Sequence, residues 1–302
     1  MKLYPITFSI PETKVQKDVR KLTKIKMISS LIPGKLDTYI YNNEKDYYEE
    51  YQKSFFAITT KKGGWDCLRH YEIIANGCIP YFPNIENCPT NTLSLFPKTL
   101  IIEGNQLYEK YKNKNVNELT LENIQEYNNL NELLINYLKN NLTTIKIAQY
   151  ILNNINTKNV ENILYLSGDT SPDYLRCLTL HGFKTLLKKN CHDYPKVPHI
   201  YKKDENDYNL LYGKGITYTN LLENELHDNI LEENVKENII NKKYDIIIYG
   251  SYHRGMPFLE LIYQYYEPDK IILLCGEEYP HICDYNIWIN KGHYVFVREL
   301  DH

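Results

Sequence analysis

Short apolar runs alternate with stretches of helical periodicity along most of this chain. The clearest run covers residues 244–250 (Tyr-Asp-Ile-Ile-Ile-Tyr-Gly), and it is followed by a helical pattern over 256–266 and a second run over 270–276. Strands that alternate with helices are joined by crossover connections, which make a sheet parallel. The sequence therefore predicts an α/β fold.

The same pattern extends over both halves of the chain. In the first half we expect strands at residues 39–41, 55–59, 79–82 and 99–102, and helices at 44–52, 66–76 and 119–152. In the second half we expect further strands at 163–167, 198–201 and 293–297, and a further helix at 172–180.

An Asn-rich segment at residues 153–159 separates the halves. We therefore expect two Rossmann-like domains, residues 1–155 and 156–302, each of about 150 residues, a usual domain size. Their parallel sheets would face a common cleft, and open α/β sheets bind ligands at the carboxyl ends of their strands. Functional residues are therefore sought in the loops that follow strands.

Composition narrows the class of protein. The 35 basic and 38 acidic residues give no general attraction for nucleic acid, so no nucleic-acid partner is predicted. No run reaches the roughly 18 apolar residues of a membrane span. The first residues lack a signal-peptide core, and the seven scattered cysteines are expected to be free thiols of a cytoplasmic protein. Abundant Tyr, Lys, Asn and Ile fit an AT-rich genome, such as that of a bacterium or a giant virus; a viral protein would lie in the host cytoplasm or the virion.

The densest chemical signal lies between residues 54 and 83. An expected strand is followed by Lys61, Lys62, Gly63 and Gly64, and a helix then begins. Paired glycines let the backbone approach a ligand, a helix N-terminus offers free N–H groups, and the lysines add positive charge. The combination predicts a binding place for a diphosphate.

Arg69 and Glu72 share one face of that helix because they are three residues apart. Arg69 would clamp a phosphate, and Glu72 would accept hydrogen bonds from two ribose hydroxyls. The plain alternative is a solvated loop and a surface ion pair worth about 0.2–0.5 kcal/mol. Asp66 favours this alternative, because it can cap the helix and would repel an anion.

This segment resembles the signature of exostosin-type glycosyltransferases. In that family a strand leads into a Gly-containing loop, then Ser-x-Arg-x-x-Glu, and after a short spacer Gly-Cys-Ile-Pro. Residues 67–72 (Cys-Leu-Arg-His-Tyr-Glu) and 77–80 (Gly-Cys-Ile-Pro) stand in the same order. The similarity covers roughly residues 39–85, under a fifth of the chain.

The resemblance implies a GT-B-like architecture with the donor-type domain first in the chain. The nucleotide-sugar donor is a substrate, so no cofactor is expected, and Lys61 and Arg69 would neutralise the leaving diphosphate without a metal. The absence of an Asp-x-Asp motif agrees with a metal-independent reaction, and the resemblance favours inversion. The donor would be bound by Lys61, Lys62, Gly63, Gly64, Arg69 and Glu72.

The sequence departs from the family in three respects. Cys67 stands where the family has Ser, which removes an expected hydrogen bond to phosphate. The donor-type domain comes first rather than second. The family's membrane anchor is absent from this sequence, so a secretory setting is not carried over.

Two loops of the second half carry candidate bases. His253 lies in residues 250–255 after the clearest strand, and an unperturbed His side chain is suited to proton transfer near neutral pH. Glu277 and Glu278 follow the next strand and are the alternative catalytic residues. Arg254 would hold a phosphate or carboxylate.

Further positions are weaker candidates. Asp169 and Ser251 are expected beside the cleft, although Asp169 is equally suited to cap a helix. Residues 211–219 are expected as a loop bordering the cleft. A zinc site at Cys275, His281 and Cys283 would lack an obvious fourth ligand.

The predicted function is transfer of a sugar from a nucleotide-sugar donor to a hydroxyl of a glycan or another acceptor. Two alternatives stay open. A non-catalytic nucleotide- or glycan-binding protein would bind without turnover. A methyltransferase-like enzyme would bind its nucleotide cofactor near residues 167–171.

Overall fold

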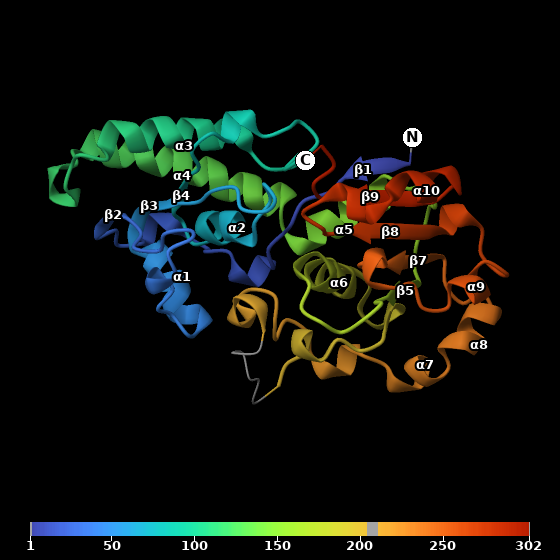
Figure 1. Ribbon diagram of the computed structural model, residues 1–302. Helices are drawn as coiled ribbons and strands as arrows, with labels where there is room; N and C mark the ends of the chain where they lie inside the picture. Colours follow the sequence, from blue (N-terminus) through green and yellow to red (C-terminus); the bar gives the residue numbers. More distant parts are fainter. Residues whose placement is uncertain (1, 204–210, 302) are drawn as a thin grey trace.

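The larger sheet is formed mainly by the second half of the chain (Figure 1). A computed structural model describes residues 2–203 and 211–301. All strand pairs of the larger sheet are parallel. In spatial order the strands are β1 (Leu3–Pro5), β9 (Tyr294–Val297), β8 (Ile271–Cys275), β7 (Ile246–Tyr249), β5 (Ile163–Leu166) and β6 (Cys191–Tyr194).

Helices cover both faces of this sheet, which explains why its central strands are apolar throughout. Alternate residues of β7 point to opposite faces: Ile246 and Ile248 pack in one hydrophobic cluster, and Ile247 and Tyr249 in another. The first face is covered by α5 (Thr144–Asn153) and α6 (Tyr174–Leu187). The second is covered by α8 (Val235–Ile240), α9 (Leu259–Ile262) and α10 (Tyr285–Asn290), and α7 (Asn229–Glu233) contacts β6 at the edge.

The smaller sheet belongs to the first half. Its parallel strands lie in the order β2 (Lys26–Ile28), β3 (Ser54–Ile58) and β4 (Ile79–Tyr81). The helices around it are α1 (Glu44–Gln52), α2 (Leu68–Ala75), α3 (Lys98–Tyr111) and α4 (Leu121–Asn141). Both sheets are parallel, so the loops after their strands are the places to search for a site.

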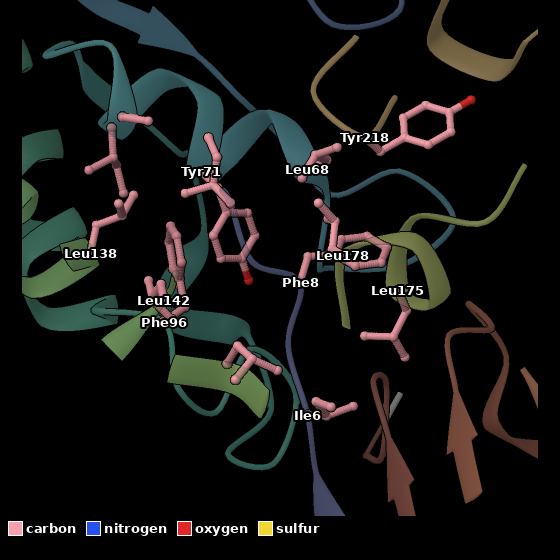
Figure 2. Packing of buried hydrophobic residues seen from close by; sticks show 14 of the residues in the cluster. Ile6, Phe8, Leu68, Tyr71, Phe96, Leu138, Leu142, Leu175, Leu178 and Tyr218 are labelled. Atoms are coloured by element: carbon pink, nitrogen blue, oxygen red, sulfur yellow. The ribbon is translucent and has the colours of Figure 1, made fainter. Parts of the chain in front are cut away.

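The two halves share one continuous hydrophobic cluster. Figure 2 shows Phe8, from the segment after β1, among Leu68 and Tyr71 of α2 and Leu175 and Leu178 of α6. The N-terminal strand β1 itself pairs with β9 of the larger sheet. The expected boundary near residue 155 stays a prediction, but β1 belongs to the sheet formed by the second half.

The predicted mixed α/β class with parallel strands is confirmed, and the arrangement is compatible with Rossmann-like folds. Six expected strands correspond to β3, β4, β5, β7, β8 and β9. Among the described residues, no helix is long and apolar enough to cross a membrane.

Several expected elements are wrong. Residues 99–102 lie inside α3, and 39–41 and 198–200 form no strand. The helix expected over 119–152 is two helices, α4 and α5, and only α9 forms within 256–266. The cysteines are not all free thiols, because Cys275 and Cys283 form a disulfide.

Candidate functional site

A cavity of about 760 Å³ lies where loops at the carboxyl ends of both sheets meet. The first half contributes residues from the β3–α2 loop and from α2. The second half contributes the loops after β7, β8 and β9, together with residues 211–216. Predicted site residues that line this cavity are Lys62, Gly64, Arg69, Glu72, Arg254, Glu277 and Glu278.

Arg69 is held at the cavity wall by α2, in which every side chain is buried. Its Nη2 donates to the hydroxyl of Tyr39, whose ring centroid lies 5.1 Å from the guanidinium carbon. Its Nε has no hydrogen-bond partner, and no described carboxylate forms an ion pair with it. With only 8% of its surface exposed, Arg69 is a buried cation that an anionic ligand would satisfy.

Glu72 lies one turn further along α2 and connects the two halves of the chain. Its carboxylate accepts hydrogen bonds from Tyr47 (2.7 Å) and from Thr217 of the second half (2.5 Å). Burial raises the pKa of Glu72, although the two hydrogen bonds and nearby Arg69 oppose that shift. The Thr217 hydroxyl, whose proton goes to Glu72, accepts a hydrogen bond from the hydroxyl of Tyr48 (2.5 Å). Residues 211–219 are therefore anchored across the cavity.

The glycine pair has a packing role. A Cβ at Gly63 would overlap the carboxylate of Glu278, and one at Gly64 would overlap that of Glu299. The two glycines therefore let two acidic side chains of the second half approach the loop closely. A diphosphate directly against Gly63 would meet Glu278, so the space beside Lys62 and Arg69 is the better place for an anion.

The two lysines before the glycines differ in position. Lys62 lines the cavity, and its Nζ lies 5.9 Å from the centroid of the Tyr39 ring. Lys61 is absent from the cavity wall, and its Nζ lies 5.1 Å from the centroid of the Trp65 ring. Lys62 is therefore the lysine placed to contact a ligand together with Arg69.

The structure brings two of the candidate bases together. The Nε2 of His253 lies 2.7 Å from Oε1 of Glu277. Burial lowers the pKa of His253 despite nearby Glu277, which favours a neutral imidazole. Glu277 lines the cavity, whereas His253 lies behind it, so Glu277 is the group that a ligand would meet.

Asp169, Ser251 and Arg254 belong to one cluster of ion pairs and hydrogen bonds, in which the Nε of Arg254 makes an ion pair but no aligned hydrogen bond among the described residues. Arg254 forms an ion pair with Asp173 (Nε to Oδ2, 3.2 Å), which also accepts a hydrogen bond from Ser251 (2.7 Å). A Cβ at Gly168 would overlap the backbone of Arg254, so the loop after β5 is closed by the loop after β7. Binding of a nucleotide cofactor near residues 167–171, as the methyltransferase alternative expects, stays a prediction.

Sequence reasoning missed Arg298 as a cavity residue. Its Nε donates to the carbonyl of Gly276 (2.8 Å), its Nη1 to the carbonyl of Asp66, and its guanidinium lies 4.5 Å from the centroid of the Phe8 ring. Arg298 directly follows the strand expected at 293–297, so the search of strand ends could have found it. Asp66 also lines the cavity and does not cap α2, whose N-cap is Cys67.

Tyrosines and the crossing segment complete the wall. The tyrosines that line the cavity include Tyr39, Tyr174 and Tyr212. The ring centroids of Tyr174 and Tyr212 lie 5.5 Å apart. Lys214 reaches across to the carbonyl of Tyr41 (3.0 Å). Residues 211–216 do border the cavity, in agreement with the loop expected there.

The zinc interpretation of the second half is contradicted by the disulfide, which removes Cys275 and Cys283 as thiolate ligands. The part of the chain that the structure describes contains no group of three or more His, Cys, Asp or Glu side chains suited to hold a metal.

Comparison of the chain with family models, with curated proteins and with solved structures finds no match. The class that can be stated is a mixed α/β protein whose two parallel sheets meet at a charged cavity.

Proposed function

We propose that this protein is a GT-B-like glycosyltransferase that moves a sugar from a nucleotide-sugar donor to a hydroxyl acceptor. The observation that carries this proposal is Arg69, a buried guanidinium at the wall of a 760 Å³ cavity with no carboxylate partner among the described residues. An anionic group in the cavity would complete the hydrogen bonding of Arg69. The resemblance of residues 67–72 and 77–80 to exostosin-type enzymes supports a nucleotide sugar as that anion.

The donor diphosphate would lie beside Arg69 and Lys62. The ribose would lie near Glu72, whose oxygens each accept one hydrogen bond but have a second lone pair for a ribose hydroxyl. As the bond between the anomeric carbon and the diphosphate oxygen breaks, negative charge grows on the leaving group. Arg69 and Lys62 would stabilise that charge in the transition state.

Glu277 would act as the base. It would take the proton of the acceptor hydroxyl as that oxygen forms its bond to the anomeric carbon, and the nucleoside diphosphate would leave. His253 would be a positioning residue, because it contacts Glu277 at 2.7 Å but does not line the cavity. The acceptor is therefore expected on the side of the cavity formed by the second half.

Binding by Arg69 is tested with a panel of nucleoside diphosphates, nucleotide sugars and S-adenosylmethionine, measured by thermal stabilisation and titration calorimetry. A nucleotide sugar should stabilise the wild type, and Arg69→Met should weaken its binding about 10- to 100-fold through loss of a charged hydrogen bond. Arg20→Met is the matched control, because Arg20 is exposed and pairs with Glu132. Unchanged affinity in Arg69→Met, or stabilisation by S-adenosylmethionine alone, would refute the proposal.

Turnover separates an enzyme from a non-catalytic binder. Glu277→Gln should keep the affinity for the donor within a few-fold and lower donor hydrolysis or transfer at least about 100-fold, the usual contribution of a general base. Donor binding by the wild type with no turnover for any acceptor tested would favour the binder.

A further inference from the structure

The groups along the cavity wall follow a definite order, which contacts between neighbours establish. Tyr39 contacts Arg69 and lies under Lys62. Lys62 is followed by Gly63, against which the carboxylate of Glu278 lies. The wall thus passes from an aromatic end, through a cationic middle, to an acidic end formed by the loop after β8.

The acidic end is closed by Arg298. Its guanidinium donates to the carbonyls of Gly276 and Asp66, and Nη1 also lies 3.3 Å from Oε1 of Glu299. Glu277, Glu278 and Asp66 therefore line this end of the cavity together with Arg298, whose guanidinium is already engaged.

The other nearby cation is also engaged. Arg254 lines the cavity, but it forms the ion pair with Asp173 and donates to Ser171 (2.6 Å). The two cations of the middle section, Lys62 and Arg69, have no such ion pairs among the described residues. The middle section thus carries two cations without an ion pair among the described residues, and three of the lining carboxylates, Glu277, Glu278 and Asp66, lie at the acidic end, whereas Glu72 and Asp173 line other parts of the wall.

We infer that the acidic end holds the transferred sugar, and that this sugar is neutral or carries an amino group rather than a carboxylate. This inference rests on the proposed function. With the diphosphate between Lys62 and Arg69, the next group along the wall faces Glu278 and Glu277. Carboxylates accept hydrogen bonds from sugar hydroxyls and attract an ammonium group, whereas a uronate placed there would be desolvated beside like charges.

The test compares neutral and acidic sugars on the same nucleotide. Calorimetry would measure the binding of UDP, UDP-glucose and UDP-glucuronate, and of GDP, GDP-mannose and GDP-mannuronate, to the full chain at pH 8. For the nucleotide that binds, the neutral sugar should bind at least about tenfold more tightly than the uronate, because the uronate brings one like-charge contact. Burial raises the pKa of Asp66 to about 7, so the ratio should be smaller at pH 6, where Asp66 is protonated.

Charge-neutral variants locate the origin of the selectivity. Glu278→Gln should reduce the ratio several-fold, and Glu277→Gln provides a second variant should the first fail to fold. Glu223→Gln is the control, because Glu223 is exposed and pairs with Lys202 away from the cavity wall.

The outcomes distinguish this inference from the proposal on which it rests. If neither nucleoside diphosphate nor any nucleotide sugar binds, the proposed function itself fails. If a nucleoside diphosphate binds but its uronate and neutral sugar bind equally to the wild type, only the inference about the sugar is overturned. A ratio that is the same in the wild type, Glu277→Gln and Glu278→Gln would also overturn it.

Discussion

Two buried arginines occupy similar places in the two halves and have different surroundings. Arg69 and Arg176 each lie in the first turn of the helix that follows a parallel strand. Arg176 donates to the carbonyl and carboxylate of Asp169 (2.7 and 3.0 Å) and to the carbonyl of Ser171. Among the described residues Arg69 donates to the Tyr39 hydroxyl alone, and the Nε of each arginine has no hydrogen-bond partner there. The comparison separates an arginine that closes its own loop from one that is available to a ligand.

The pKa values of Asp169, in the loop after β5, and Asp66, in the loop after β3, are shifted in opposite directions. Burial acts to raise the pKa of Asp169, but hydrogen bonds from Ser171 and Arg176 outweigh it and lower that pKa. Burial raises the pKa of Asp66 to about 7, because Arg298 and the hydrogen bonds from Phe8 and Tyr71 do not offset desolvation. The charged groups of the loop after β5 pair with one another more fully than those of the loop after β3.

The largest expected effect breaks the closed loop. Arg176→Met should lower the free energy of unfolding by about 3–4 kcal/mol, because it removes a buried cation and leaves two backbone carbonyls without their donor. Arg69→Met should change the free energy of unfolding by less than about 1 kcal/mol, because the guanidinium it removes has little compensation for burial. Urea unfolding of both variants measures the difference. Equal losses would mean that Arg69 is a structural residue as well.

Much of the alternation of strands and helices could be predicted from the sequence. Residues 244–250 and 270–276 are apolar because helices cover both faces of β7 and β8, so the signal was strong. Strand-end reasoning also chose Arg69 and Glu277, which the structure brings to one cavity. Whether they act on a ligand stays a prediction.

The errors have physical causes. Residues 99–102 have the composition of a strand. Over the longer window of α3, however, the buried residues recur three or four apart, at Ile101, Gly104, Leu107 and Tyr111. β6 was missed because residues 191–194, Cys-His-Asp-Tyr, are polar, and Asp193 is buried there by pairing with Lys184 (2.7 Å). The place of β1 beside β9 depends on a contact between the two ends of the chain, which no local pattern reveals.

The next expected effect is an opposite dependence on pH at the two aspartates. The folded state holds the Asp66 proton until the pH approaches a pKa of about 7, whereas the unfolded state releases it near the ordinary aspartate pKa of 3.8. Stability attributable to Asp66 is therefore present below pH 4 and is lost as pH rises toward 7. Relative to Asp66→Asn, the wild type should lose about 1.4 kcal/mol per pH unit between pH 4.5 and 6.5.

Asp169→Asn provides the matched control for this measurement. Because the folded-state pKa of Asp169 is lowered, its contribution is present above pH 3.8 and is lost only at more acidic pH. Wild type and Asp169→Asn should therefore show parallel stability curves from pH 4.5 to 6.5. A parallel curve for Asp66→Asn in that range would contradict an elevated pKa at Asp66.

The smallest expected effect distinguishes the glycines of the two loops. A Cβ at Gly168 meets the backbone of Arg254, which cannot move without opening the closed loop, so Gly168→Ala should cost about 1–3 kcal/mol of unfolding free energy. A Cβ at Gly63 meets only the end of the Glu278 side chain, which can rotate away, so Gly63→Ala should cost less than about 1 kcal/mol. Thermal or urea unfolding measures both variants. Because Gly63→Ala displaces Glu278, it should also alter the binding of a sugar nucleotide. A large loss of unfolding free energy in Gly63→Ala would show instead that the loop after β3 is as rigid as the loop after β5.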